Sequence, residues 1–452
     1  MTTPPPAAPA ECEPPSTVSF PEALRYWFKL GCISFGGPAG QIALMHEELV
    51  ERRRWISERR FLHALNYCMV LPGPEATQLA VYIGWLLHRT PGGIVAGTLF
   101  VLPSLLLLIL LSWIYLAWGH LPLVAGVLYG VKPAVVAIVA AAGWRLGTRT
   151  LRNPSLILIA LAAFIAIAVL HLPFPFVIAG AAVLGIAGGR LVPGHFAPAA
   201  SGHGASGQPS LPALIGDDTP PPAHARPGWR TMLLPALAGI GIGMAAWGLL
   251  AATLGEGHAL ARMGGFFTKA ALLTFGGAYA VLPYVVQNAV DNYHWLTPAQ
   301  MIDGLALGET TPGPLIMIVS FVGFVGGWSQ AVLGGQPFLG GVAGAVVATF
   351  FTFLPSFVFI LAGGPVVEAT RDDLRLTAPL TAISAAVVGV ILSLALFFAW
   401  HVFRLGAAPR DWDAMAMIVA AGAALALIRY RLGTIPVIGA CGIAGLVISY
   451  LR

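Results

Sequence analysis

The sequence contains few charged residues. Of its 452 residues, 10% are Asp, Glu, Lys or Arg and 57% are hydrophobic, whereas an ordinary soluble domain is about 25% charged. So few charged groups cannot solvate the surface of a soluble fold with this much apolar area. Apolar runs such as 94–118 and 156–170 reach or approach the roughly 20 residues that cross a bilayer core. The composition predicts an all-α integral membrane protein with several spans.

Reactive and cofactor-binding motifs are also missing. The four cysteines form no C-x-x-C pair and have no His at metal-ligand spacing, so small buried residues are favoured over a redox role: Cys12, Cys32, Cys68 and Cys441. The chain has no G-x-x-x-x-G-K-[ST] loop, no H-E-x-x-H and no nucleophile elbow, which argues against an enzyme. The net charge of +5 requires no nucleic-acid partner. We expect no cofactor and no metal.

What the sequence does contain is an internal repeat. Pro72-Gly73-Pro74 recurs 240 residues later as Pro312-Gly313-Pro314. Other matches at this spacing are Phe35-Gly36-Gly37 with Phe275-Gly276-Gly277, Lys29 with Lys269, and Trp55 with Trp295. Further along, Leu102-Pro103-Ser104 matches Leu354-Pro355-Ser356 at a spacing of 252, which predicts an insertion in the second copy near 329–340. The chain is predicted to be a duplicated unit whose repeated parts break helices.

Eight apolar stretches are predicted to be membrane spans: 91–118, 123–146, 154–171, 174–192, 338–363, 377–401, 412–428 and 433–451. Four other segments have glycine or proline at their centre and are not predicted to be single helices: 28–45, 61–87, 267–285 and 300–328. These four are either kinked spans or half-helices that return to the side they came from. The second alternative keeps the basic loops together on the cytoplasmic side, so we favour re-entrant hairpins.

The two copies differ in the charge of one loop. Loop 46–60 carries five arginines, whereas the equivalent loop 286–299 has no Lys or Arg. Basic loops stay in the cytoplasm, so these loops are predicted to lie on opposite sides of the membrane. One apolar helix without a partner in the first half, 232–254, would carry the chain across once. We therefore predict two inverted repeats, an architecture of secondary transporters.

The predicted organisation has five parts. Residues 1–20 lack Lys, Arg and an apolar core and are predicted to be a disordered tail rather than a signal peptide. The others are a first repeat (21–192), a flexible linker rich in Pro, Gly and Ser (193–229), a connecting transmembrane helix (230–256) and a second, inverted repeat (257–452). Linker histidines His195, His203 and His224 are more simply solvated than metal-bound.

The two Pro-Gly-Pro turns predict a binding site. Gly73 and Gly313 allow sharp reversals, and a new helix can start after Pro74 and Pro314. The free N–H groups and positive dipole end of a helix start attract anions. Small residues also permit close helix packing, but two matched sets favour a site. The predicted substrate-binding residues at the breaks are Gly36, Gly37, Gln41, Pro72, Gly73, Pro74, Thr77, Gln78, Gly276, Gly277, Thr310, Thr311, Pro312, Gly313 and Pro314.

These residues also carry a resemblance to a known family. The motifs are Phe35-Gly36-Gly37-Pro38, Leu71-Pro72-Gly73-Pro74 with Gln78-Leu79-Ala80, Tyr82-Ile83-Gly84, Thr274-Phe275-Gly276-Gly277, and Thr310-Thr311-Pro312-Gly313-Pro314. Together they resemble the chromate ion transporter family in its long, two-domain form, over nearly all of 20–452. The resemblance implies export of chromate, a tetrahedral dianion like sulfate, across the inner membrane, which gives resistance to chromate.

A divalent oxyanion needs positive charge and hydrogen-bond donors. Lys132 lies inside an apolar run, and Lys269 lies one turn before the second Phe-Gly-Gly motif. Each is either ligand-facing or a lysine that reaches the interface, the reading favoured for Lys29. Glu75 and Glu309 would repel the anion, and burial disfavours a charged carboxylate. A Glu that takes up a proton when the anion binds would couple transport to the proton gradient. For Glu75 the alternative is a carboxylate that satisfies its own helix start.

The sequence therefore predicts a secondary active chromate exporter, multi-pass in the inner membrane, with the lipid bilayer as its surroundings. A sulfate or other oxyanion carrier remains an alternative, because nothing in the motifs separates these substrates by chemistry. An anion channel and a membrane enzyme are the alternatives of a different class. The coupling ion and a homodimer are left open.

Overall fold

The structure is a computed structural model that describes residues 17–35, 37–119, 121–196, 212–217, 219–220, 222–275, 277–369, 377–404 and 412–451. The described part of the chain is built from helices, with two isolated β-bridges, Ile56–Ile215 and Arg404–Trp412. Most of the predicted tail and residues 197–211 of the predicted linker lie outside these ranges. From the tail, the Val18 carbonyl accepts a hydrogen bond from the His88 ring at 3.0 Å.

The first half contains α1 (Phe20–Ile33), α2 (Gly37–His46), the π-helix η1 (Glu47–Arg52), α3 (Glu58–Val70), α4 (Glu75–Trp118), α5 (Pro122–Thr150), α6 (Pro154–Ala168), α7 (Phe174–Leu191) and the short 3-10 helices η2 (Pro193–His195) and η3 (Ala223–Ala225). It is followed by α8 (Trp229–Leu254), α9 (Ala259–Leu272), α10 (Ala278–Val286), the π-helix η4 (Gln287–Asn292), α11 (Pro298–Thr310), the 3-10 helix η5 (Leu315–Met317), α12 (Ile318–Ser329), α13 (Pro337–Ala369), α14 (Thr377–Phe403), α15 (Ala414–Ile428) and α16 (Thr434–Leu451).

Seven of the described helices are long and apolar enough to cross a membrane: α4, α5, α7, α8, α13, α14 and α16. This confirms the prediction of an all-α, multi-pass membrane protein. The helix α8 has no buried residue although it packs on α13, which fits a peripheral helix with one face toward lipid. The helices α6 and α15 are shorter, with 15 residues each.

Helices end and restart at the predicted breaks, and the bounds recur at the spacing of the sequence repeat. The π-helices η1 and η4 begin 240 residues apart, and so do α3 and α11. Between them, α3 and α4 are separated by Pro72-Gly73-Pro74, and α11 and η5 by Pro312-Gly313-Pro314. In the first half, the predicted boundary between 61–87 and 91–118 falls at a kink within α4, where the non-helical angles of His88 and Arg89 separate two helical parts. In the second half, residues 330–336 separate α12 from α13, where the insertion was predicted.

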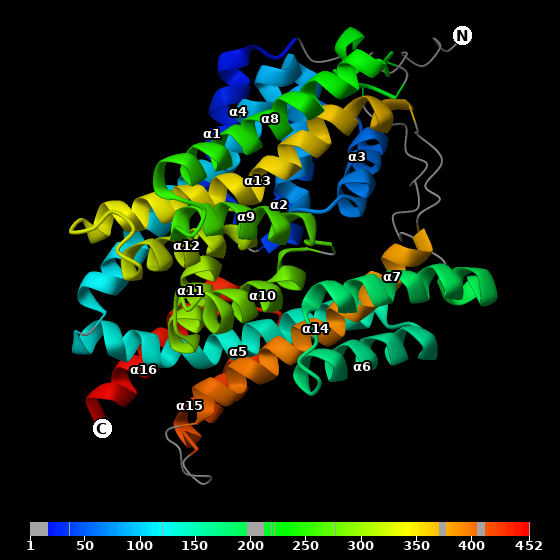
Figure 1. The fold of residues 1–452 in the computed structure, drawn as a ribbon. Helices are drawn as coiled ribbons and strands as arrows, with labels where there is room; N and C mark the ends of the chain where they lie inside the picture. Colours follow the sequence, from blue (N-terminus) through cyan, green and yellow to red (C-terminus); the bar gives the residue numbers. More distant parts are fainter. Residues whose placement is uncertain are drawn as a thin grey trace, which may run out of the picture.

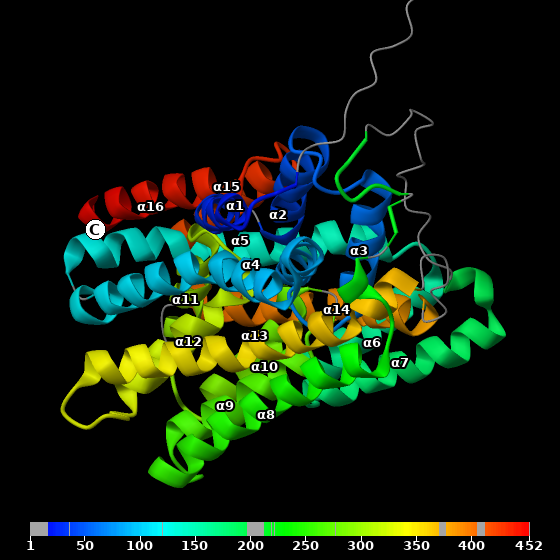
Figure 2. The same cartoon turned by 90° about the horizontal axis from the view of Figure 1, so that it is seen from above.

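The long helices form two bundles, one above the other in Figure 1. In the upper bundle, α13 packs against α4, α8, α9 and α12, and α1 packs against α4. In the lower bundle, α5 packs against α14, α15 and α16, and α14 packs against α6 and α7. Figure 2, a view from above, places α16 near one edge of the molecule and α8 and α9 near the opposite edge. Between the bundles, α11 packs on α5 and α12, and α10 packs on α14 and α9.

The described residues between 212 and 229, called the docked segment below, lie against the first half. The backbone N–H groups of Leu214 and Ile215 donate to Arg54 O at 2.9 Å and Trp55 O at 3.1 Å. The His224 ring donates to the carbonyl of Trp85 at 2.9 Å. Part of the predicted flexible linker is thus held against the first half by these hydrogen bonds and by the buried side chain of Ile215. Its flexibility stays a prediction.

Candidate functional site

Each Pro-Gly-Pro turn lies against the helix break of the other half. The Gly73 N–H donates to the carbonyl of Thr274 at 2.7 Å, and the Gly313 N–H donates to the carbonyl of Ser34 at 2.8 Å. Thr274 follows α9 and Ser34 follows α1, and these two residues are 240 apart in the sequence. Two reciprocal hydrogen bonds thus bring all the interrupted segments to one place.

Both turns require glycine for two reasons. Gly73 has φ +125° and Gly313 has φ +105°, which residues with a Cβ rarely adopt. A Cβ on Gly73 would also collide with the Ser356 hydroxyl of α13, and one on Gly313 would lie 2.7 Å from Cβ of Ser104 on α4. Ser104 and Ser356 are the matched serines of the Leu-Pro-Ser repeat. The repeat pointed to these serines, but neither was predicted to be a site residue.

Two amide side chains that were predicted to bind substrate donate hydrogen bonds to the backbone of the turns. Gln41 Nε2 donates to the carbonyl of Gly313 at 2.5 Å and to that of Ser34 at 3.3 Å. Gln78 Nε2 donates to the carbonyl of Pro72 at 2.8 Å. Both side chains are fully buried. The sequence predicted these side chains as hydrogen-bond donors to the substrate, and that role stays a prediction. The structure places them at the turns, where their N–H groups bond to the backbone.

Several buried oxygens beside the turns have no hydrogen-bond partner within the described residues: Gln41 Oε1, Gln78 Oε1, Thr77 Oγ1 and Ser104 Oγ. Leaving a buried polar group unpaired costs about 1–3 kcal/mol. Native proteins avoid this cost by supplying water or a ligand at such a place. A cluster of this kind is therefore suited to a small polar ligand.

The helix start after the first turn offers backbone donors. The first three N–H groups of α4, on Glu75, Ala76 and Thr77, precede the first bond that returns to the turn, from Gln78 N to Pro74 O at 3.0 Å. Pro74 provides no side-chain cap. The second start is different, because the single 3-10 turn η5 precedes α12. The predicted helix start at Leu315 is thus less regular than that at Glu75.

The two predicted coupling carboxylates lie close to these breaks. Glu309 is 8% exposed and accepts a hydrogen bond from the hydroxyl of Tyr279 on α10. Glu75 is half-buried, and its Oε1 lies 3.9 Å from the place of a Cβ on Gly277. No described residue forms an ion pair with either carboxylate. The Tyr279 partner was not predicted, because the sequence match pairs Tyr279 with an alanine.

Other predicted ligands are less favourably placed. The Thr310 and Thr311 hydroxyls donate to carbonyls of their own helix, Leu307 at 2.8 Å and Gly308 at 2.9 Å. Gly36 and Gly276 lie outside the described residues. Lys269, like Lys29, is exposed on the surface of its helix. No contact among the described residues places Lys269 at the turns, so its role as a ligand stays a prediction.

Lys132 belongs to a different polar group. Its Nζ lies 3.4 Å from Asp303 Oδ2, and Tyr115 donates to the same oxygen at 2.9 Å. These residues line a cavity of about 470 Å³ where α4 ends and α5 and α11 begin. Sequence reasoning found Lys132 through its charge in an apolar run. It missed Asp303, which has no counterpart of its kind in the first half.

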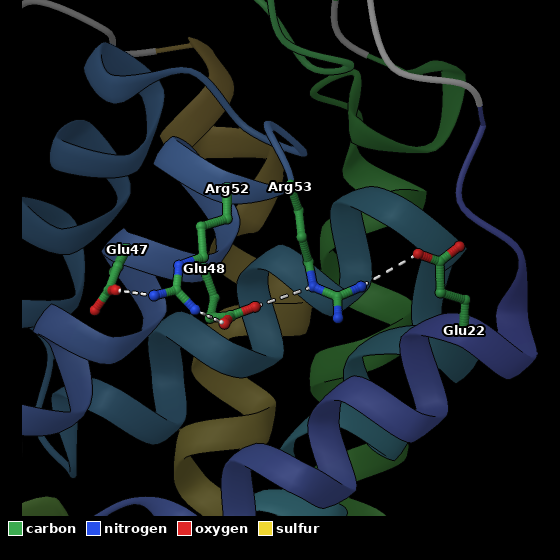
Figure 3. Close-up of polar contacts among 5 residues, drawn as sticks. All are labelled: Glu22, Glu47, Glu48, Arg52 and Arg53. Atoms are coloured by element: carbon green, nitrogen blue, oxygen red, sulfur yellow. Dashed lines mark hydrogen bonds and ion pairs between the residues drawn. The ribbon is translucent and has the colours of Figure 1, made fainter.

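Two arginines of loop 46–60, Arg52 and Arg53, form ion pairs with nearby glutamates (Figure 3). Arg52 contacts Glu47 at 2.6 Å and Glu48 at 3.1 Å. Arg53 contacts Glu48 and Glu22 at 3.2 Å each, and its guanidinium lies over the rings of Tyr26 and Trp55. These two arginines therefore do not form an open basic funnel toward the turns.

The fold and the site define a class of protein. It is a polytopic α-helical membrane protein in which two matched sets of interrupted helices meet at buried Pro-Gly-Pro turns.

Comparison with known proteins identifies the family. The profile of the chromate transporter family matches residues 22–186 and 261–446, and the chain belongs to this family. A chromate transport protein of Pseudomonas aeruginosa is 32% identical over 444 residues, 95% of this chain and 93% of that protein. One of Cupriavidus metallidurans is 29% identical over 382 residues, 83% of this chain and 81% of that protein. A probable chromate transport protein of Synechococcus elongatus is 28% identical, covering 82% of this chain and 83% of that protein. No solved structure matches the chain.

Proposed function

We propose that this protein is a secondary active carrier that exports chromate across the inner membrane and so confers chromate resistance. Its two halves are inverted repeats, and the oxyanion binds where the two Pro-Gly-Pro turns meet. Membership of the chromate transporter family supports chromate as the substrate. The reciprocal pair of hydrogen bonds, Gly73 N–H to Thr274 O and Gly313 N–H to Ser34 O, supports the turns as the binding site.

The anion is held by the start of α4. The free N–H groups of Glu75, Ala76 and Thr77 and the positive end of the helix dipole provide the attraction. The unpartnered hydroxyls of Thr77 and Ser104 supply further donors nearby. The turn glycines act differently from the donors, because their own N–H groups are already used between the halves. They set the shape of the site and do not touch the ligand through N–H.

Glu75 couples the anion to a proton. Its carboxylate stands on the first turn of α4, beside the N–H groups that hold the dianion. Two negative groups so close repel each other, which favours the neutral acid while the anion is bound. Departure of the anion then releases the proton on the same side, so proton and dianion cross together, and the inside-negative membrane potential, which favours exit of their net negative charge, drives export. Glu309, held by Tyr279, is the corresponding candidate in the second half.

The proposal is tested with purified protein in liposomes and radiolabelled chromate. A carrier gives saturable flux that responds to an imposed proton gradient and falls when an uncoupler is added. Flux that rises linearly with chromate and ignores the gradient indicates a channel. Equal inhibition by equimolar sulfate and unlabelled chromate indicates a general oxyanion carrier. Flux no greater than that of empty liposomes contradicts chromate transport altogether.

A further inference from the structure

A cavity of about 470 Å³ lies away from the helix breaks, where α4 ends and where α5 and α11 begin. We call it the vestibule, and it is lined by Tyr115, Tyr129, Lys132, Gln300 and Asp303 among others. A water molecule takes up about 30 Å³ in the liquid. The vestibule therefore has room for a tetrahedral dianion together with part of its hydration shell.

Asp303 is held through only one of its oxygens. The residue is 2% exposed. Its Oδ2 accepts from Tyr115 at 2.9 Å and faces Lys132 Nζ at 3.4 Å. Its Oδ1 is buried and has no hydrogen-bond partner among the described residues. A buried ion pair stabilises a fold only when its remaining lone pairs are satisfied, so this pair is poorly suited to a purely structural role.

The vestibule also presents unused donors. The Lys132 side chain is 31% exposed, and a single carboxylate oxygen occupies at most one of its three N–H bonds. Gln300 accepts from the Thr297 N–H through Oε1 at 2.8 Å, in a capping box that fixes the side chain. Its NH₂ group donates to no described residue, and Gln300 lines the vestibule. A lysine ammonium and an amide NH₂ are groups that bind an oxyanion.

We propose that the vestibule is a second oxyanion-binding site, in which the transported dianion replaces Asp303 as the ion-pair partner of Lys132. The proposal rests on the proposed function for its substrate. Asp303 keeps the Tyr115 hydroxyl when Lys132 turns to the anion. The same exchange loosens the two bundles, because Lys132 belongs to α5 in the lower bundle and Asp303 to α11, which also packs on α12 in the upper bundle. The dianion and Asp303 then repel each other, which favours separation of α11 from α5.

The test compares wild type with Lys132→Gln, Asp303→Asn and the double variant. The initial rate of chromate transport into liposomes is measured over a range of chromate concentrations, at equal protein content. We expect Lys132→Gln to raise the half-saturating concentration about tenfold, the range for a lost hydrogen bond between charged groups. Asp303→Asn should lower it, because Lys132 is then free for the anion. The double variant should resemble Lys132→Gln.

A structural ion pair predicts another pattern. Both single variants would then have a higher half-saturating concentration than wild type, and the double variant would return toward the wild-type value. That result overturns the vestibule site, as does an unchanged half-saturating concentration in Lys132→Gln. Lys132→Arg retains the charge and should stay within about threefold of wild type, which separates loss of charge from misfolding. If wild type itself moves no chromate, the proposed function fails. If wild type transports chromate but Lys132→Gln and Asp303→Asn do not shift the half-saturating concentration in opposite directions, the vestibule site is wrong and the proposed function stands.

Discussion

Two equivalent loops of this protein share one backbone conformation but have different surroundings. Loop 46–60 and loop 286–299 each begin with a π-helix and contain a buried tryptophan, Trp55 or Trp295. The residues before the tryptophans, Arg54 and His294, have φ of 53° and 51°. The docked segment covers the first loop, whereas a cavity of about 570 Å³ lies beside the second. Gln300 of α11 lines both this cavity and the cavity of about 470 Å³. The same backbone unit is thus covered by the docked segment in one half and lies beside a cavity in the other.

The difference arises from side chains rather than from the backbone. Around loop 46–60, Ile215 packs among the apolar residues near Trp55, and Asp217 accepts from the Ser57 hydroxyl at 2.5 Å. At the other loop, Trp295 stacks on Tyr293 with ring centroids 4.5 Å apart. The carbonyls of Trp295 and His294 accept hydrogen bonds from the side chains of Ser329 at 2.9 Å and Gln330 at 3.4 Å. Different segments thus contact the two loops, the docked segment at the first and residues 329–330 at the second.

The largest effect is expected at the turns, which both ends share. Gly73→Ala and Gly313→Ala should each nearly abolish chromate transport, because a Cβ opposes the positive φ, at a cost of about 1–3 kcal/mol, and collides with the facing serine. Gly180→Ala is the matched control, since a Cβ there meets nothing within 4 Å. Transport is measured in vesicles alongside the amount of protein in the membrane. Normal transport by both turn variants would show that chromate does not bind at the turns.

The next effect separates the two roles of Glu75. Glu75→Gln should still bind chromate but lose the response of transport to a proton gradient, because the neutral amide cannot exchange a proton. Flux is measured with and without an imposed gradient. Glu256→Gln, in the connection between α8 and α9, is the control and should behave as wild type. A Glu75→Gln protein that retains full gradient dependence would leave Glu75 as a helix-start residue only.

A moderate effect is expected where the docked segment covers the first loop. Ile215→Asp should release this segment, because a charge replaces a side chain that is 6% exposed. Release is measured as faster cleavage of residues 212–229 by a protease in everted vesicles. Pro212→Asp, which adds the same charge at an exposed position of the segment, should change the rate little. Equal cleavage of both variants and wild type would show that the contact does not persist in the membrane.

The smallest effect concerns pH. Burial in the docked segment lowers the pKa of His224, and Arg89 lowers it further, although the bond to the Trp85 carbonyl opposes them. The docked state therefore binds fewer protons than the released state, so docking is strongest above the free histidine pKa of about 6.5 and weakens as pH falls below it. Protease cleavage should be modestly faster at about pH 5.5 than at about pH 7.5, on either side of that value. His224→Gln should lose this dependence, and an unchanged pH profile in that variant would assign it to another group.

Sequence reasoning located the breaks but not the contacts between them. Repeated tripeptides mark where helices must end, because proline and glycine act locally. That Gly73 bonds to Thr274 depends on how the two halves pack, and no local pattern records that. Asp303 was missed for the same reason, since its partner Lys132 lies far away in the sequence. The docked segment was missed because Ile215 is a single apolar residue within a composition typical of linkers.

The inverted arrangement of the two halves is the central claim, and a matched pair of cysteines tests it most directly. Glu51 and Asp291 are exposed, lie 240 residues apart and occupy equivalent places in the two π-helices. Each is replaced by Cys in a chain whose four native cysteines are changed to Ala, and a membrane-impermeant thiol reagent is applied to intact cells and to everted vesicles. The account predicts that Glu51→Cys reacts only in everted vesicles and Asp291→Cys only in intact cells. Reaction of both from the same side would contradict it.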